Sequence, residues 1–294
     1  MAKVDLLQDK FSEEDIKALR FPPRRKQITG NWQFILKPKS EVKDYALNVP
    51  FPPLKRAFDE VFPDIRHIRW RNNNNHTFYT YLKDVSEEEI SGIENYFQSI
   101  VGCVAIRDCL PISFAIDFDR EEGNPNLNQT EIALLRSRAK PYGTTKVNDS
   151  FYSAADELAD KTIGFIRKVK FYNNLDAVIG MPPSDPDKEY KLTYILANRI
   201  AQELKFEDLS RLVEKKFKTP ETKSLPIEKK LDSIKGSLSA SNEVADRKVL
   251  LVDDLYQSGI TTNYVAMLLL NAGSKQVYSL SCEKTCRNDD NTGA

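Results

Sequence analysis

The sequence has no excess charge of either sign, few histidines and no long hydrophobic run. Its 43 basic and 43 acidic residues give a formal net charge of zero, which argues against a general polyanion binder. With two histidines in the whole chain, a histidine-based catalytic triad has little support. The longest apolar run, residues 265–270, is far shorter than the roughly 20 residues that span a bilayer. The N-terminus lacks the apolar segment of a signal peptide, so we expect a cytoplasmic protein with no membrane contact.

Cysteine is also scarce, and its spacing does not favour a metal site. Cys103, Cys109, Cys282 and Cys286 lack the two-residue gap that is common in zinc-binding motifs. We therefore expect reduced thiols, as in most cytosolic proteins.

The residues that are present suffice for two folded domains. The 294 residues are 40% hydrophobic and 10% aromatic, which is typical of a globular chain with a substantial core. In the first part, Ser12 and Ser86 each precede acidic residues and an apolar helical pattern, which predicts two capped helices. Aromatic and β-branched runs at 32–36, 77–82 and 112–118 predict strands. We expect an α+β N-terminal domain or extension over 1–125, ending in the polar stretch 119–128.

From residue 126 to 294 the pattern changes to alternating helices and strands. It predicts helices at 153–170, 192–204 and 262–271, with strands at 175–181, 208–217, 248–252 and 276–280. Continuous apolar strands between helices indicate a mostly parallel sheet covered by helices on both faces, an α/β fold. A polar, lysine-rich segment follows at 218–247, and its part at 218–240 is expected to be an exposed, mobile loop that closes over a ligand.

The most informative segment is 249–262. An apolar strand delivers Asp253 and Asp254 to the carboxyl edge of the sheet, where open α/β folds bind ligands. The small-residue turn around Gly259 then leads directly into a helix, and backbone N–H groups at such a turn favour a phosphate. The two acids would repel a bare phosphate but suit ribose hydroxyls with a divalent cation nearby. The predicted ligand is a sugar 5′-phosphate.

This segment resembles the signature of type I phosphoribosyltransferases, enzymes that use phosphoribosyl pyrophosphate (PRPP) and Mg²⁺. The resemblance implies that Asp253 and Asp254 bind the ribose hydroxyls, with Mg²⁺ held near them by the ligand. It also implies that the 5′-phosphate lies on a loop of Gln257, Ser258, Gly259, Ile260, Thr261 and Thr262. The segments 220–236, with Lys223 as a catalytic candidate, and 279–285 resemble ComF-type competence proteins.

In this family a loop after an earlier strand binds the pyrophosphate of PRPP. The corresponding residues here are Met181, Pro182, Pro183 and Ser184. The prolines leave fewer N–H donors, and Asp185 and Asp187 add negative charge, which Lys188 or Lys191 could offset.

The resemblance implies a transferase that displaces pyrophosphate from PRPP, or hydrolyses it, with an acceptor that the sequence does not identify. The N-terminal domain is a candidate for recognising an acceptor base or a protein partner. The alternative is a PRPP- or nucleotide-binding sensor without turnover, which the unusual pyrophosphate loop favours. Arg66, Arg69, Trp70 and Arg71 suggest a nucleic-acid contact, although an ordinary exposed face explains them better.

Overall fold

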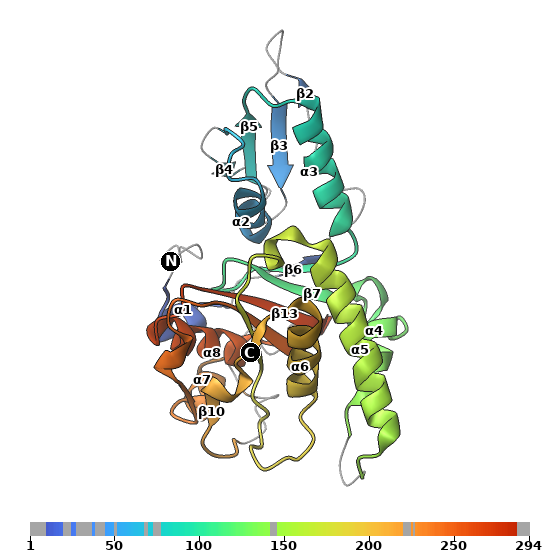
Figure 1. Ribbon diagram of the computed structural model, residues 1–294, viewed down its shortest axis with the longest axis vertical. Coiled ribbons are helices and arrows are strands. Elements are labelled where there is room, and N and C mark those ends of the chain that lie inside the picture. Colours follow the sequence, from blue (N-terminus) through green and yellow to red (C-terminus); the bar gives the residue numbers. More distant parts are fainter. Residues whose placement is uncertain are drawn as a thin grey trace.

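The computed structural model describes the greater part of the chain, with gaps that fall mainly before residue 78. The described residues are 10–19, 25–27, 37–38, 45–49, 52–67, 70–72, 78–141, 146–219, 225 and 227–286. Figure 1 shows a small unit of strands and helices at one end of a larger α/β unit. The predicted strand at 32–36 lies outside the described residues.

The larger unit is built on a seven-stranded sheet. Its order is β1 (Arg25–Gln27), β6 (Val104–Ile106), β7 (Ser113–Phe118), β13 (Gln276–Lys284), β12 (Lys248–Tyr256), β8 (Ala177–Gly180) and β9 (Glu207–Asp208). The strands from β7 to β9 pair in parallel, whereas β6 and β1 continue the sheet antiparallel. Val252 lies opposite Leu280 on one side and Gly180 on the other. The α/β fold with a mostly parallel sheet is therefore confirmed.

Helices cover both faces of this sheet because its central strand is apolar on both sides. Along β12, Leu250 and Val252 belong to one buried cluster, and Val249 and Leu251 belong to another. The first cluster includes residues of α5 (Asp149–Lys168) and α6 (Leu192–Leu204), beside α4 (Glu131–Ala139). The second includes residues of α1 (Glu13–Lys17), α7 (Ile227–Ile234) and α8 (Ile260–Asn271). Figure 1 shows the two groups of helices on opposite sides of the sheet.

The smaller unit is a four-stranded antiparallel sheet with two helices. Its order is β2 (Lys37–Pro38), β3 (Tyr45–Val49), β5 (Phe78–Leu82) and β4 (Arg71–Asn72), and α2 (Pro52–Val61) and α3 (Glu87–Ser99) complete it. Phe58 of α2 stacks on Phe97 of α3 with ring centroids 6.2 Å apart.

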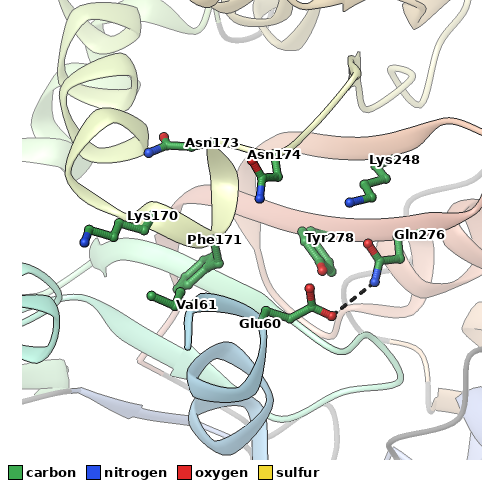
Figure 2. Close-up of a pocket in the computed structure, with 9 residues that line it drawn as sticks. All are labelled: Glu60, Val61, Lys170, Phe171, Asn173, Asn174, Lys248, Gln276 and Tyr278. Carbon is green, nitrogen blue, oxygen red and sulfur yellow. Dashed lines mark hydrogen bonds between the residues drawn. The ribbon is translucent and has the colours of Figure 1, made fainter. Parts of the chain in front are cut away.

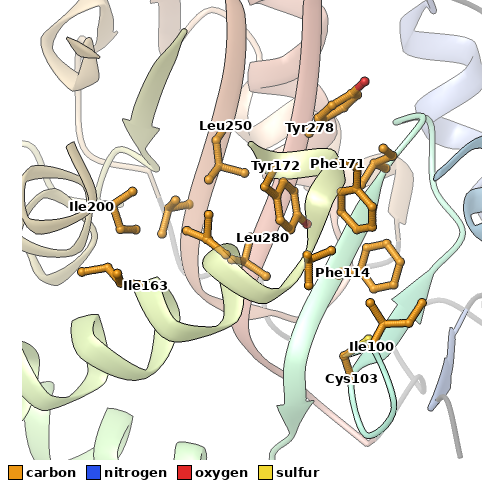
Figure 3. Packing of buried hydrophobic residues seen from close by; sticks show 14 of the residues in the cluster. Ile100, Cys103, Phe114, Ile163, Phe171, Tyr172, Ile200, Leu250, Tyr278 and Leu280 are labelled. Atoms are coloured by element: carbon orange, nitrogen blue, oxygen red, sulfur yellow. The ribbon is translucent and has the colours of Figure 1, made fainter. Parts of the chain in front are cut away.

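The cores of the two units are continuous. Tyr96 of α3 lies edge-on to Phe171, with ring centroids 6.3 Å apart, and Phe171 stacks on Phe114 of β7. Phe171 and Tyr172 lie in the short 3₁₀ helix Lys170–Tyr172, which follows α5. Figure 3 shows the rings of Phe114, Phe171 and Tyr172 beside Leu280 and Leu250 of the central strands.

The domain boundary predicted between residues 125 and 126 falls between strands of the same sheet. Strands β1, β6 and β7 come from the chain before residue 125, and β7 pairs with β13 through a register that places Ser113 opposite Ser279. The sheet therefore contains strands from both sides of the predicted boundary. Strand β7 joins it because Phe114 and Ala115 are buried like the apolar residues of the central strands.

The lysine-rich segment contains more regular structure than the sequence suggested. The strand predicted at 208–217 is wrong over most of its length: a 3₁₀ turn, Ser210–Leu212, precedes the three-residue strand β10 (Val213–Lys215). The expected loop at 218–240 contains α7 and β11 (Leu238–Ala240), which pairs with β10, and the 3₁₀ turn Asn242–Val244 follows it. Leu231 and Ile234 of α7 are buried, so this helix is anchored to the core.

Both predicted helix caps are present. The Ser12 and Ser86 side chains accept the backbone N–H groups of Asp15 and Glu89, and both acids bond back to the cap residues. Within the described part of the chain, no helix is long and apolar enough to cross a membrane.

Candidate functional site

The candidate site lies where the direction of the chain through the main sheet reverses. From β8 the chain passes through α6 to β9 on one side, whereas β12 and β13 lie on the other side of β8. Ligands bind preferentially in the crevice at such a switch point. The Met181 N–H donates to the Val252 carbonyl oxygen at 2.8 Å, so the loop after β8 begins beside Asp253.

The two acids predicted to bind ribose are the sixth and seventh residues of the nine-residue strand β12, which is longer than predicted. Asp254 is buried and already has two cationic partners from α4 and its C-terminus. Its Oδ2 accepts from Arg136 Nε at 2.9 Å and from Lys140 Nζ at 2.5 Å. Arg136 also contacts Glu283 of β13, with Nη1 3.0 Å from Oε1. Asp253 is half-buried, and one of its oxygens accepts the Asp254 backbone N–H.

These surroundings shift the pKa values of the two acids in opposite directions. Burial and the neighbouring charge of Asp254 raise the pKa of Asp253 to about 7, although Lys140 opposes the change. Burial also disfavours the ionised form of Asp254, but Lys140 and Arg136 outweigh it and hold its pKa below the usual value. Asp254 is thus a fixed anion, and Asp253 is the acid whose ionisation a ligand can change.

Glu283 is a third acid that sequence reasoning missed. It is buried, and burial raises its pKa to about 7 against the opposing charge of Arg136. Its Oε2 has no hydrogen-bond partner among the described residues. It lies in the segment 279–285 that resembles ComF-type proteins, but that resemblance gave it no role, because its ion pair with Arg136 joins residues far apart in the sequence.

The predicted phosphate loop forms a tight turn at the N-terminus of α8. Gly259 has a φ of 75° and precedes Ile260, the first residue of the twelve-residue helix. Gln257, Ser258 and Thr261 are half-buried, and Thr262 is buried in the first turn. The backbone N–H groups of a first helical turn have no partners within the helix, and the helix dipole favours an anion there. This geometry can hold a phosphate.

A buried polar network fixes this turn from behind. The Asp108 carboxylate accepts from the Tyr256 hydroxyl at 2.9 Å and from Asn263 Nδ2 at 3.3 Å. Asn263 Nδ2 also donates to the Gly259 carbonyl oxygen at 2.7 Å, and its Oδ1 accepts the Cys109 N–H at 3.0 Å. The segment before β7 therefore positions the loop after β12.

The predicted pyrophosphate loop is close to the acids but is less negative than its sequence suggested. Met181 and Pro182 are buried, Pro183 is half-buried and Ser184 is exposed. Lys218 Nζ lies 2.8 Å from Asp185 Oδ2. The hydrogen bond from Lys218 holds the pKa of Asp185 below its usual value.

The same loop is tied to the segment that follows β10. The Thr219 N–H donates to the Ser184 carbonyl oxygen at 3.2 Å, and Lys215 Nζ donates to Thr219 Oγ1 at 3.1 Å and Ser237 Oγ at 2.8 Å. Burial lowers the pKa of Lys215 to about 8. Lys223, the predicted catalytic lysine, lies outside the described residues.

Residues 191–284 match the family model of the phosphoribosyl transferase domain. The match covers about a third of the chain and runs from the residue before α6 to the end of β13. It includes Asp253, Asp254 and the loop 257–262, and it leaves out Arg136, Lys140 and the loop at 181–184. No curated protein matches the chain significantly.

The phosphoribosyl transferase domain and its parallel sheet agree with the predicted family, at the level of the type I fold. The match does not distinguish a ComF-type subfamily. The cations that contact Asp254 come from α4 and the residue after it, before the matched region, so this chain supplies part of the candidate site from a segment that the family model does not cover.

Gly259→Ala is expected to weaken binding of a sugar phosphate at least about tenfold, because the turn loses its shape. A Cβ at this position would overlap the Tyr256 hydroxyl, and the residue would keep a left-handed φ of 75°. We expect the free energy of unfolding to fall by about 1–3 kcal/mol. Calorimetric titration with ribose 5-phosphate and urea unfolding measure the two effects.

Gly164→Ala in α5 is the matched control. A Cβ there meets no atom within 4 Å, so helix propensity should raise the free energy of unfolding by roughly 0.5–1 kcal/mol without changing affinity. Equal affinity of the Gly259→Ala and unmodified proteins for ribose 5-phosphate would show that this turn does not bind the phosphate.

Proposed function

We propose that this chain is a phosphoribosyltransferase that binds PRPP with Mg²⁺ and displaces its pyrophosphate. The observation that carries the proposal is the junction of β12 and α8 at the switch point. There a half-buried acid and a phosphate-holding turn lie a few residues apart within the matched domain. The acceptor is a base or another nucleophile, and the smaller unit formed before residue 100 is the candidate for recognising it or a protein partner.

In this proposal each part of the junction has one task. The N–H groups of the loop 257–262 bind the 5′-phosphate, and ionised Asp253 accepts a hydrogen bond from a ribose hydroxyl. Arg136 and Lys140 keep Asp254 ionised, and its fixed negative charge favours positive charge developing on the ribose. The pyrophosphate lies toward Met181 and Ser184, where Lys215 and Lys218, which contact this loop or the segment bonded to it, are basic candidates.

The residues present fit a Mg²⁺ ion that the ligand carries. The described residues contain no cluster of three or more acids, histidines or cysteines that would hold a metal alone. Asp253 has a pKa of about 7, and a cation beside it would favour its ionised form. Mg²⁺ would neutralise charge on the departing pyrophosphate, and Asp253 would orient the ribose.

Affinity for PRPP is expected to rise roughly tenfold between pH 6 and pH 8. A group with a pKa of about 7 is about one-tenth ionised at the lower pH and nine-tenths at the higher. Calorimetry at both pH values measures the change. Asp253→Asn is the reference protein. Its affinity still varies with pH through the titration of the ligand phosphates, but no longer through the titration of residue 253. An identical rise in both proteins would show that Asp253 does not titrate on binding.

A sensor that binds PRPP or a nucleotide without turnover is the second candidate. It is favoured by the binding of Asp254 to Arg136 and Lys140, which leaves one acid for the ribose, and by the two prolines in the pyrophosphate loop. Release of pyrophosphate from PRPP, measured with a panel of bases and with water as acceptors, distinguishes the two. Saturable PRPP binding with no release of pyrophosphate under any of these conditions would contradict the transferase and favour the sensor.

A further inference from the structure

A polar cavity lies at the amino ends of the central strands, on the opposite edge of the sheet from the candidate site. It has a volume of about 290 Å³ and opens between α2, the 3₁₀ helix after α5, and the first residues of β12 and β13 (Figure 2). Its lining residues are Glu60, Val61, Lys170, Phe171, Asn173, Asn174, Lys248, Gln276 and Tyr278. The volume is at the lower end of the roughly 300–1,000 Å³ of ligand pockets.

The cavity is separate from the site proposed for PRPP. Lys248 is the first residue of β12 and Asp253 is five residues further along the same strand. At about 3.3 Å per residue this places the two roughly 17 Å apart. One ligand of ordinary size therefore does not occupy both.

Two lysines give the cavity an unbalanced positive charge. Neither Lys170 nor Lys248 has an ion-pair partner among the described residues, and Glu60 is the one carboxylate in the lining. The Lys248 backbone N–H donates to Asp176 Oδ2 at 2.8 Å, and this bond fixes the start of the strand. It does not involve the ammonium group of Lys248. Figure 2 shows Lys248 and Asn174 on one side of the cavity, so an anionic group there would meet an ammonium and an amide.

Hydrogen-bond acceptors lie beside this positive charge, on Glu60 of α2 and on Gln276, which pairs with Lys248 across β12 and β13. Gln276 Nε2 donates to Glu60 Oε1 at 3.2 Å, and this bond joins β13 to α2. Gln276 Oε1 is shielded from solvent and has no hydrogen-bond partner among the described residues. An unsatisfied buried acceptor destabilises the protein, and a hydrogen-bond donor on a ligand would satisfy it. Burial and the charge of Glu60 raise the pKa of Tyr278, so this buried residue stays a neutral phenol.

We propose that this cavity binds a small metabolite with a phosphate or carboxylate group at one end and an amine or hydroxyl group at the other. The anion lies against Lys248 and Asn174, and the donor satisfies Gln276 Oε1 beside the Glu60 carboxylate. Such a ligand contacts both the smaller unit, through α2, and the strands that lead to Asp253. This site is independent of the proposed function, because it shares no residue with the PRPP site.

The test uses O-phosphoethanolamine and β-alanine, which place a phosphate or a carboxylate at a short distance from an ammonium group. Each is titrated into the full chain and followed by the amide NMR signals of Asn174, Lys248 and Gln276. We expect at least one to bind with a dissociation constant below about 10 mM, and to bind at least about tenfold more tightly than inorganic phosphate or ethanolamine alone. The better of the two identifies the anion.

Substitutions locate the binding. Lys248→Gln should weaken it at least about tenfold, because it removes the ammonium group and keeps the backbone bond to Asp176. Lys275→Gln, a neighbouring exposed lysine that does not line the cavity, should leave it unchanged. Asp253→Asn should also leave it unchanged, which separates this site from the one proposed for PRPP.

Four results would overturn the proposal, and the first three concern the probes and the variants. These three are no shift of these signals by either probe at about 10 mM, equal affinity in the Lys248→Gln and unmodified proteins, and loss of binding in Asp253→Asn. Inorganic phosphate binding as tightly as both probes would also contradict it, because the Glu60 end would then contribute nothing.

Discussion

Asp253→Asn is expected to lower PRPP-dependent release of pyrophosphate at least about 100-fold, the largest effect of any substitution considered. Asparagine keeps the size of the side chain and removes the charge that accepts from the ribose. The reaction is followed by the release of pyrophosphate at saturating PRPP and Mg²⁺. Asp246→Asn is the matched control, because Asp246 is exposed and has a left-handed φ of 62° that asparagine tolerates.

The same substitution should stabilise the fold at neutral and alkaline pH. Burial and Asp254 raise the pKa of Asp253 to about 7 from a usual value of 3.8, so ionising this acid opposes folding. Stability is highest below the unfolded pKa and is lost as the pH rises from about 4 to about 7. Asp253→Asn removes this loss, so its melting temperature should exceed that of the unmodified protein by a few degrees at pH 8 and equal it at pH 4. A variant that is inactive and also less stable at pH 8 would indicate a structural role instead.

Arg136→Ala is expected to lower the free energy of unfolding by about 3–5 kcal/mol. The substitution leaves the buried carboxylate of Glu283 without the guanidinium and leaves Asp254 with Lys140 alone. Without the guanidinium the pKa of Glu283 rises further, so this buried acid must take up a proton, and buried Asp254 keeps one cationic partner. Because breaking a buried ion pair costs much more than an exposed pair contributes, the loss should far exceed that of a surface arginine. Urea unfolding at pH 7.5 measures it.

Arg138→Ala provides the comparison on the same helix. Arg138 is exposed and lies 3.6 Å from Glu157, so its loss should cost less than about 1 kcal/mol. Arg136→Lys should recover only part of the stability, because one ammonium group does not present the planar fork that spans Asp254 and Glu283. Equal stability of the Arg136→Ala and Arg138→Ala proteins would contradict the ion network.

The parts of the fold that sequence reasoning predicted well are those whose signals are local. The cap at Ser86, the helix 192–204 and the strand, turn and helix around 249–262 each depend on residues within about one element of one another. The α/β fold follows from that alternation. The ends of β12 and β13 were placed too early, because the polar residues Asp253, Ser281 and Glu283 continue the strands.

The missed residues lie far apart in the sequence. Arg136 and Asp254 are separated by 118 positions, and Tyr256 and Asp108 by 148, and no local pattern relates the members of either pair. Helix α7 was missed for a different reason: its lysines and acids give a polar composition that hides the apolar spacing of Leu231 and Ile234. Buried charges in a cluster are recognised only when the topology brings their elements together.

A crystal structure of the protein with PRPP and Mg²⁺ shows directly whether the switch-point crevice binds PRPP. We expect the 5′-phosphate within hydrogen-bond distance of the N–H groups of residues 258–262, a ribose hydroxyl on Asp253, and Asp254 still bound to Arg136 and Lys140. A 5′-phosphate bound elsewhere on the molecule, or no ligand at saturating concentration in crystals with an open switch-point crevice, would contradict it.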